Sequence, residues 1–311
     1  MAHTRFIKDA GLTARMTLVM FVLGALFVGI VATIIGVAGP SYAPLIAIVA
    51  LGIVFYQWYT SDKVAMRAMR AREVTPEEAP ELHGMIDRLC ALADMPKPRV
   101  AIADTDLPNA FATGRSPQRS VVCVTTGILR KIDAEELEGV LAHELSHVAH
   151  RDVLVMTLAS SAGIVAAMLT RSFQFGGFGM MSGGRSRNNS NNSNNGGAPA
   201  WLVVLLVSLL VYAISFLATR LLSRYRELCA DRSGAYLTQK PAKLASALQK
   251  ITGEMAAIPQ RDLRASSAMN AFFIAPAISG ASLKTLTSTH PSLEQRLEQL
   301  ARIQAELSRP S

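Results

Sequence analysis

His143 and His147 lie four residues apart in the stretch HELSH. On an α-helix this spacing turns the chain by about 40° and advances it by roughly 6 Å, so both imidazoles can reach one ion. Neutral imidazole is a common zinc ligand. Glu144 flanks the same face, where a carboxylate can take a proton from metal-bound water. The motif predicts zinc held by His143 and His147 with Glu144 as general base; two unrelated surface histidines are the alternative.

A catalytic zinc site needs a third protein ligand and an open position. A pattern with glycine at position 150 and histidine at 153 fails, because the chain has His150 and Val153. Glu227 and Asp231 lie four residues apart and can share one helical face. We expect Glu227 to bind zinc and Asp231 to orient a ligating histidine through its free ring nitrogen. A solvated pair of charges on a helix is the alternative.

The distance from apolar segments favours Glu227 as the third ligand. One such segment begins at Val153, six residues or roughly 9 Å of helix after His147. Another ends at Thr219, eight residues or roughly 12 Å before Glu227. If the two segments pair as an antiparallel hairpin, both sets of ligands emerge at nearly the same height above a bilayer.

The composition is that of a membrane protein. Half of the 311 residues are hydrophobic and 17% are charged, against about 25% charged in soluble domains. Residues 16–61 carry no charge and are interrupted at 39–41, so each half can form a membrane helix. Two further apolar segments, 153–170 and 200–219, flank a Gly/Asn/Ser-rich stretch at 173–198 that we expect to be a flexible loop. About four transmembrane helices are predicted.

Basic residues predict the orientation of the first hairpin. Both of its flanks are rich in Lys and Arg while its turn is uncharged, so both flanks should be cytosolic. Three arginines in the later loop leave open whether the second hairpin spans fully. The predicted division is a membrane hairpin (1–61), a cytosolic part with the HELSH helix (62–152), a second hairpin (153–219) and a second cytosolic part (220–311).

Charge and cysteine usage exclude other classes. The net charge is +8, but the Lys and Arg residues lie beside apolar runs and no nucleic-acid motif is present, so we expect no nucleic-acid partner. Cys90, Cys123 and Cys229 lack CxxC spacing and are expected to be buried free thiols in a reducing compartment. The first apolar run is too long for a cleavable signal peptide and is expected to be a retained anchor.

Local signals place the remaining elements. Thr75 followed by Pro76 predicts the start of a helix that ends near Asp94. Asp133 with Glu136 predicts a capping box at the start of the HELSH helix. We also expect strands at 99–103, 109–113 and 120–125 and an amphipathic helix at 292–307. The fold class is mainly α with a small β-sheet.

Five motifs together resemble the HtpX-type membrane zinc metallopeptidases, which are more distantly related to CAAX prenyl proteases. They are HELSH, RELCAD at 226–231, NAFATG at 109–114, TTGIL at 125–129 and HPSLEQR at 290–296. The four hydrophobic segments follow the same order. The resemblance implies a cytosolic, zincin-like metallopeptidase domain with one zinc ion.

The resemblance also implies further site residues. An edge strand would bind the extended substrate backbone; its residues are Asn109, Ala110, Phe111, Ala112 and Thr113. His290 and Arg296 match a pair that faces the active site and steadies the tetrahedral oxyanion.

The expected function is that of a zinc endopeptidase of the cytoplasmic membrane, cutting misfolded or damaged membrane proteins on the cytosolic side in protein quality control. A prenyl-protein protease is one alternative. A non-enzymatic chaperone with structural zinc is another, but such a site needs a fourth ligand. Neither nearby candidate fits as that fourth ligand. His150 lies about 10 Å along the helix from His143, and Cys229 lies on the opposite side of its helix from Glu227.

Overall fold

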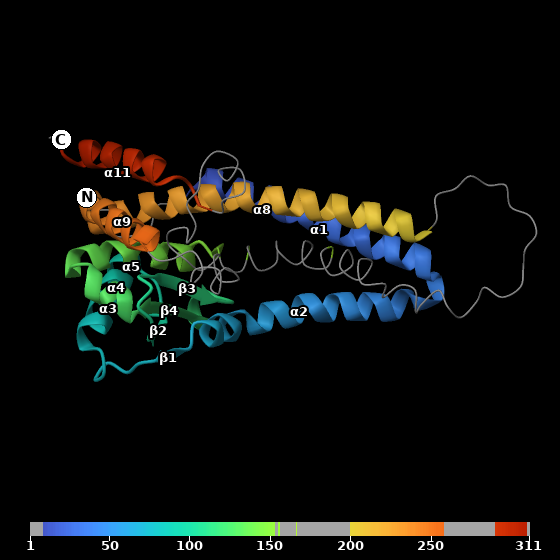
Figure 1. The fold of residues 1–311 in the computed structure, drawn as a ribbon, viewed down its shortest axis with the longest axis horizontal. Coiled ribbons are helices and arrows are strands. Elements are labelled where there is room, and N and C mark those ends of the chain that lie inside the picture. Colours follow the sequence, from blue (N-terminus) through green and yellow to red (C-terminus); the bar gives the residue numbers. More distant parts are fainter. Residues whose placement is uncertain (1–8, 153–154, 156–165, 167–199, 258–289, 310–311) are drawn as a thin grey trace, which may run out of the picture. The chain divides into compact units, whose positions relative to one another are not determined.

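The computed structural model describes residues 9–152, 155, 166, 200–257 and 290–309. It is mostly helical with one small sheet, which confirms the predicted fold class (Figure 1). The helices are α1 (Ala10–Ala38), η1 (Pro40–Tyr42), α2 (Ala43–Ala68), α3 (Pro80–Ala93), η2 (Pro117–Arg119), α4 (Thr126–Lys131), α5 (Ala134–Ala149), α8 (Ala200–Thr238), α9 (Pro241–Ala257) and α11 (Leu293–Leu307); the strands are β1 (Ala71–Glu73), β2 (Arg99–Ala103), β3 (Ala110–Gly114) and β4 (Ser120–Thr125).

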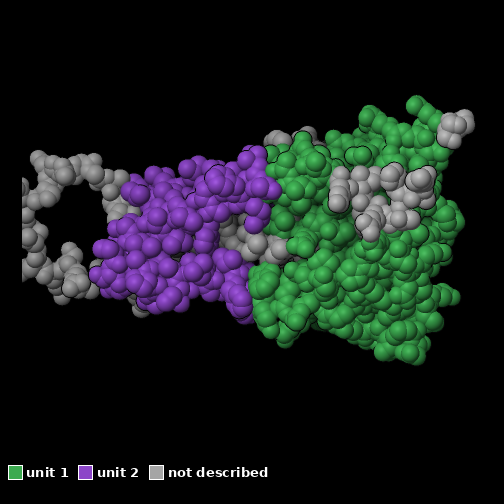
Figure 2. Space-filling model, turned by 180° about the vertical axis from the view of Figure 1, so that it is seen from behind, with its two compact units in different colours: residues 1–16, 58–156, 220–311 green, residues 17–57, 157–219 purple. Residues whose placement is uncertain are grey.

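The chain divides into two compact units, coloured separately in Figure 2. Unit 1 contains residues 1–16, 58–156 and 220–311, and unit 2 contains 17–57 and 157–219. Unit 1 holds the sheet and every residue expected to do chemistry. The predicted four-part division stays a prediction, because compactness by itself does not locate a bilayer.

Three helices among the described residues are long and apolar enough to cross a membrane. They are Ala10–Ala38, Pro40–Ala68 and Leu202–Thr238, and their assignment rests on length and composition. The first two are joined tightly at Gly39, whose φ of 103° favours glycine. The predicted segment 153–170 lies almost entirely outside the described residues, and the predicted loop 173–198 lies wholly outside them.

The sheet has the strand order β1-β2-β4-β3. β2 and β4 run parallel, while β1 and β3 pair antiparallel with β2 and β4. β3 is therefore an edge strand of this sheet. The strands expected at 99–103 and 120–125 have the predicted bounds, the one expected at 109–113 occupies Ala110–Gly114, and β1 was not predicted. A strand as short as β1 leaves no readable alternation in the sequence.

The start predicted for α3 is wrong. The helix begins at Pro80 rather than after Thr75. Thr75–Glu78 forms a turn instead, in which the Thr75 carbonyl accepts the Glu78 amide and the Glu78 carboxylate accepts the Thr75 amide at 2.8 Å. Proline suits the first helical position at residue 80 as well as at 76, so local propensity did not decide between them. The helix ends at Ala93, and the following Asp94 adopts the left-handed conformation, so the predicted end near Asp94 is confirmed.

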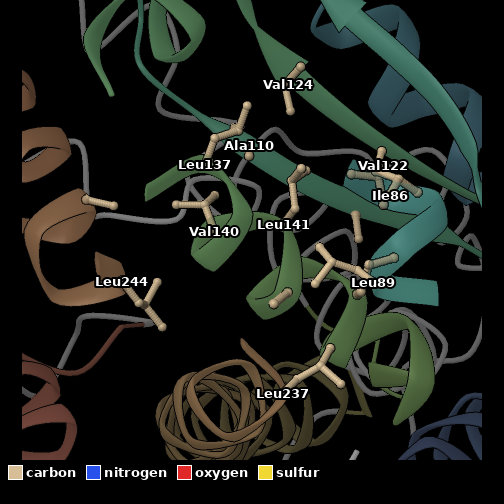
Figure 3. Close-up of a cluster of buried hydrophobic side chains, with 14 of the residues drawn as sticks. Ile86, Leu89, Ala110, Val122, Val124, Leu137, Val140, Leu141, Leu237 and Leu244 are labelled. Carbon is tan, nitrogen blue, oxygen red and sulfur yellow. The ribbon is translucent and has the colours of Figure 1, made fainter. Parts of the chain in front are cut away.

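α5 starts as predicted and packs against the sheet. Asp133 and Glu136 form the expected capping box. Leu141 and Leu145 are fully buried, in a core shared with α3, α8, α9 and the sheet. Figure 3 shows Leu141 among other apolar side chains of this core, including Ala110 of β3 and Val122 of β4. The face of α5 that carries HELSH is thereby fixed relative to edge strand β3.

α5 ends earlier than the sequence suggested. Its last residue is Ala149, and Arg151 adopts a left-handed φ of 57°. The height argument assumed a continuous helix from His147 to Val153, and that assumption is wrong. The break lets Asp152 turn back toward α5, which a straight helix would not allow because residues five apart point about 140° away from each other.

α8 and α5 approach each other closely at Gly234. A Cβ at this position would lie 2.9 Å from the His143 backbone nitrogen. Gly234 shares one helical face with Glu227 and Asp231, since the three are spaced by four and three residues. The missing side chain therefore lets α8 bring both carboxylates to the histidines of α5.

Candidate metal centre

Three buried side chains bring their ligand atoms together. The Nε2 atoms of His143 and His147 are 3.2 Å apart. A Glu227 carboxylate oxygen lies 3.6 Å from the Nε2 of His143 and the other lies 3.5 Å from that of His147. These three residues form the one group among the described residues that could hold a metal ion.

The separations fit a tetrahedral zinc site. Zinc–nitrogen and zinc–oxygen bonds are about 2.0–2.1 Å long, so neighbouring ligand atoms of a tetrahedron lie about 3.4 Å apart. The two Nε2 atoms are 3.2 Å apart, and each lies 3.5–3.6 Å from a different Glu227 oxygen. With one ligand atom from each residue, the three atoms lie within 4.8 Å of one another. Two imidazoles and one carboxylate also form a donor set that leaves the fourth position open. The residues present therefore fit a catalytic zinc ion.

Asp231 lies where it can orient the first histidine. Its Oδ1 is 2.8 Å from the Nδ1 of His143, the nitrogen that faces away from the ligand cluster. Arg296 holds the same carboxylate with two hydrogen bonds, Nε to Oδ2 and Nη2 to Oδ1, both 2.6 Å. All three side chains are buried. Arg296 thus contacts the carboxylate that contacts the histidine.

Asp152 has the same position toward the second histidine, and sequence reasoning missed it. It was interpreted as an interfacial residue, but it is 1% exposed and its Oδ2 lies 2.8 Å from the Nδ1 of His147. The Nε of Arg226 lies 3.0 Å from the same oxygen. One signal was available in the sequence: an aspartate directly before a long apolar segment is costly unless it is paired.

Glu144 joins the metal cluster to the edge strand. Its Oε2 accepts the Ala112 amide at 2.9 Å. The carboxylate is buried, and burial raises its pKa above the ordinary value, partly offset by the nearby His143 and His147. A buried carboxylate fixed beside the ligands is placed to exchange a proton with a group bound there.

The other ionisable groups make the site attractive to a cation. Burial lowers the pKa of His143, but contacts with Asp231 and Glu227 outweigh it and raise that pKa to about 9. Burial raises the pKa of Asp152, while Arg226 and His147 outweigh it and bring that pKa below its ordinary value. The carboxylates thus hold negative charge around the imidazoles.

The remaining predicted residues are placed as follows. The Nδ1 of His290 lies 3.3 Å from a Glu227 oxygen, so this residue borders the cluster. His150 is the C-cap that follows α5, and its Nδ1 lies 2.9 Å from the Ser146 carbonyl oxygen. Cys229 contacts Asp9; all three cysteines are free and buried, as predicted.

Comparison with known proteins identifies the family. Residues 76–304 match Peptidase family M48. The chain is 52% identical to Protease HtpX homolog 1 of Streptomyces coelicolor, over 98% of this chain and 97% of that one. It is 51% identical to the Protease HtpX homolog of Moorella thermoacetica, over 96% and 97%.

A solved structure is similar at a greater distance. The crystal structure of S. mikatae Ste24p aligns with a TM-score of 0.49 and 19% identity, covering 91% of this chain and 64% of that one. This chain therefore spans less than two thirds of that protein.

The catalytic class follows from the site and the relatives together. A buried His-His-Glu cluster beside a buried glutamate defines a zinc peptidase site. The chain belongs to Peptidase family M48 and is a membrane zinc metalloprotease that acts on polypeptides.

Proposed function

We propose that His143, His147 and Glu227 hold the zinc ion and that Glu144 is the general base. The observation that carries this assignment is the buried cluster in which the two histidine Nε2 atoms are 3.2 Å apart and each faces a Glu227 oxygen at 3.5–3.6 Å, beside a carboxylate that accepts a backbone amide of the edge strand. When bound, zinc polarises the scissile carbonyl and acidifies water. Glu144 takes the proton from that water and passes it to the leaving amine.

Two carboxylates position the histidines. Asp231 and Asp152 each lie 2.8 Å from an Nδ1 atom, which directs the Nε2 atoms of His143 and His147 inward. Such contacts fix the tautomer and the ring orientation of a ligand. Since Nε and Nη2 of Arg296 bond Asp231, we assign Arg296 to positioning that carboxylate, and His290 to the predicted oxyanion contact.

The substrate backbone binds along β3. The Asn109 carbonyl accepts the Thr125 amide of β4, whereas the Ala112 amide turns away from β4 to Glu144. Antiparallel strands alternate in this way, so Ala110 and Gly114 also present backbone groups outward. An extended peptide that pairs with these groups places its scissile bond beside Glu144.

We further propose that the protein lies in the cytoplasmic membrane, crosses it several times and cleaves misfolded or damaged membrane proteins on the cytosolic side. Three described helices are long and apolar enough to cross. The basic flanks at Arg15, Lys63 and Arg67 support cytosolic placement of the catalytic unit.

The decisive experiment replaces Glu144 with Gln in the full chain purified in detergent. The variant should keep near-stoichiometric zinc and lose casein cleavage by about 10²–10⁴-fold, the range for loss of a general base. Zinc is measured by elemental analysis and cleavage by peptide release. Undiminished cleavage would refute the role of Glu144. In a parallel variant, Glu227→Ala should lose most of its zinc, and an unchanged zinc content would point to another third ligand.

The two alternatives are separable by assay. A prenyl-protein protease would cleave a farnesylated peptide in preference to its unmodified form. A chaperone with structural zinc would need a fourth protein ligand, and no fourth histidine, cysteine or carboxylate joins the cluster among the described residues.

A further inference from the structure

The polar end of α2 and the connection between β3 and β4 enclose a depression of about 390 Å³. Its lining includes Tyr59, Asp62 and Lys63 from α2 and Arg115, Gln118 and Arg119 from the connection. All of these residues belong to unit 1. The depression is separate from the metal centre, and the proposed catalytic chemistry uses none of these side chains.

Three of the cations in the depression are not neutralised by acidic side chains. Arg99 also lines it, but Arg99 is paired with Asp62 at 3.0 Å and with Glu73. Lys63, Arg115 and Arg119 have no carboxylate within 4.0 Å among the residues that the structure describes; the ion pairs found there involve other residues. The depression therefore holds four cations and one carboxylate, and that carboxylate is paired with Arg99.

The backbone holds two of these cations close together. Gly114 ends β3 opposite Ser120, which starts β4. The φ of Gly114 is 141°, and a Cβ there would lie 2.5 Å from the Arg119 carbonyl oxygen. Only glycine allows this closure. Arg115 and Arg119 thus stand at the two ends of one tightly closed connection.

Aromatic side chains beside the depression indicate its level relative to a bilayer. The Arg115 guanidinium lies 4.4 Å from the centre of the Tyr59 ring and 5.9 Å from that of Trp58. α2 exposes large apolar side chains from Leu45 onward, and its first charged residue is Asp62. Tryptophan and tyrosine gather where a membrane helix passes from hydrocarbon to head groups. The uncompensated cations therefore lie at the level of lipid phosphates.

We propose that this depression binds the phosphate group of an anionic phospholipid. Guanidinium groups match phosphate oxygens with directed, charge-assisted hydrogen bonds, and a lysine adds a further donor. The proposal rests on the membrane crossing proposed for α2. Because the connection directly follows the edge strand, a bound lipid fixes the end of the strand on which substrate is expected to lie.

The two tryptophans of the chain, Trp58 and Trp201, make a direct test possible. In a Trp201→Phe background Trp58 is the sole reporter, and it lies beside Arg115. The full chain is placed in bilayers of phosphatidylcholine mixed with brominated phosphatidylglycerol or with brominated phosphatidylcholine. Quenching of Trp58 then gives the relative association of the two head groups.

We expect the anionic lipid to be preferred by about tenfold or more, since each basic residue at a membrane surface contributes a factor of about five. The triple variant Lys63→Gln, Arg115→Gln, Arg119→Gln should lower the preference to near one. A matched control, Arg130→Gln, Lys131→Gln, Arg302→Gln, removes the same charge from α4 and α11 and should retain the preference.

Three results would overturn the proposal: equal quenching by both lipids, an equal loss in the control, or loss of the preference in millimolar inorganic phosphate. The last would show a site for free phosphate instead. Zinc content and casein cleavage are measured on each protein separately, so an inactive protease that still prefers the anionic lipid would refute the proposed function and leave this inference standing.

Discussion

Gly234→Ala tests whether the contact between α5 and α8 sets the metal geometry. The new Cβ would lie 2.9 Å from the His143 nitrogen and 3.3 Å from its Cα, against an ordinary contact distance of at least 3.4 Å. The difference from the nitrogen, 3.4 − 2.9, requires the helices to separate by about 0.5 Å. A third neighbour, the Ala142 carbonyl carbon, would lie at 3.2 Å; all three are backbone atoms, so no side chain can move aside.

The expected consequences are for metal affinity and for stability. Functional sites tolerate displacements of about 0.5 Å, so Glu227 should be displaced to the limit of productive ligation. We expect zinc affinity to fall by about tenfold or more. Overpacking should cost about 1–3 kcal/mol, of which the better helix propensity of alanine returns about 1 kcal/mol.

Gly253→Ala is the matched control, because Gly253 lies in α9 with nothing within 4 Å of its would-be Cβ. This variant should gain up to about 1 kcal/mol from helix propensity and keep its zinc affinity. Zinc affinity is measured by chelator competition and stability by thermal unfolding, both in detergent. Wild-type zinc affinity in Gly234→Ala would refute the reasoning.

Two further substitutions test groups around α5. Asp152→Asn should lower zinc affinity by about 10- to 100-fold, as for other contacts that orient a ligating histidine; chelator competition checks this against the exposed Asp87→Asn, which should bind zinc normally. Glu136 is 2% exposed and bonded to Lys250 at 2.8 Å, so Glu136→Gln should destabilise the protein by about 2 kcal/mol at neutral pH. Burial raises the pKa of Glu136, but hydrogen bonds from Lys250, Ser246 and the Asp133 region outweigh burial and bring this pKa below its ordinary value of 4.5. The ionised carboxylate therefore stabilises the fold above pH 4.5. The difference in thermal unfolding between variant and wild type should shrink as the pH falls through the lowered pKa. A difference that persists at low pH would assign the loss to packing instead.

The local motifs could be recognised in the sequence because the spacing of their residues matches the repeat of the α-helix. Four residues make about one helical turn, so HELSH placed His143 and His147 on one face without any knowledge of the fold. The capping box at Asp133 was predicted in the same way, since it joins a side chain to a backbone group three residues away. A second capping box, at Ser292, was not predicted.

The third ligand had a weaker basis in the sequence. Glu227 was supported by its distance from an apolar segment, yet half of that argument assumed a helix that ends at Ala149. What brings Glu227 to the histidines is the close approach at Gly234, a contact between residues about ninety positions apart.

The sequence by itself determined the chemistry, namely two histidines, an adjacent glutamate and long apolar helices. Only the tertiary structure decided how the ligands are supported. Asp152 reaches His147 because Arg151 leaves the helical conformation, and Arg296 reaches Asp231 from another helix. The physical reason is that periodicity specifies faces of single elements, whereas contacts between elements depend on where each helix ends and how closely two backbones can pack.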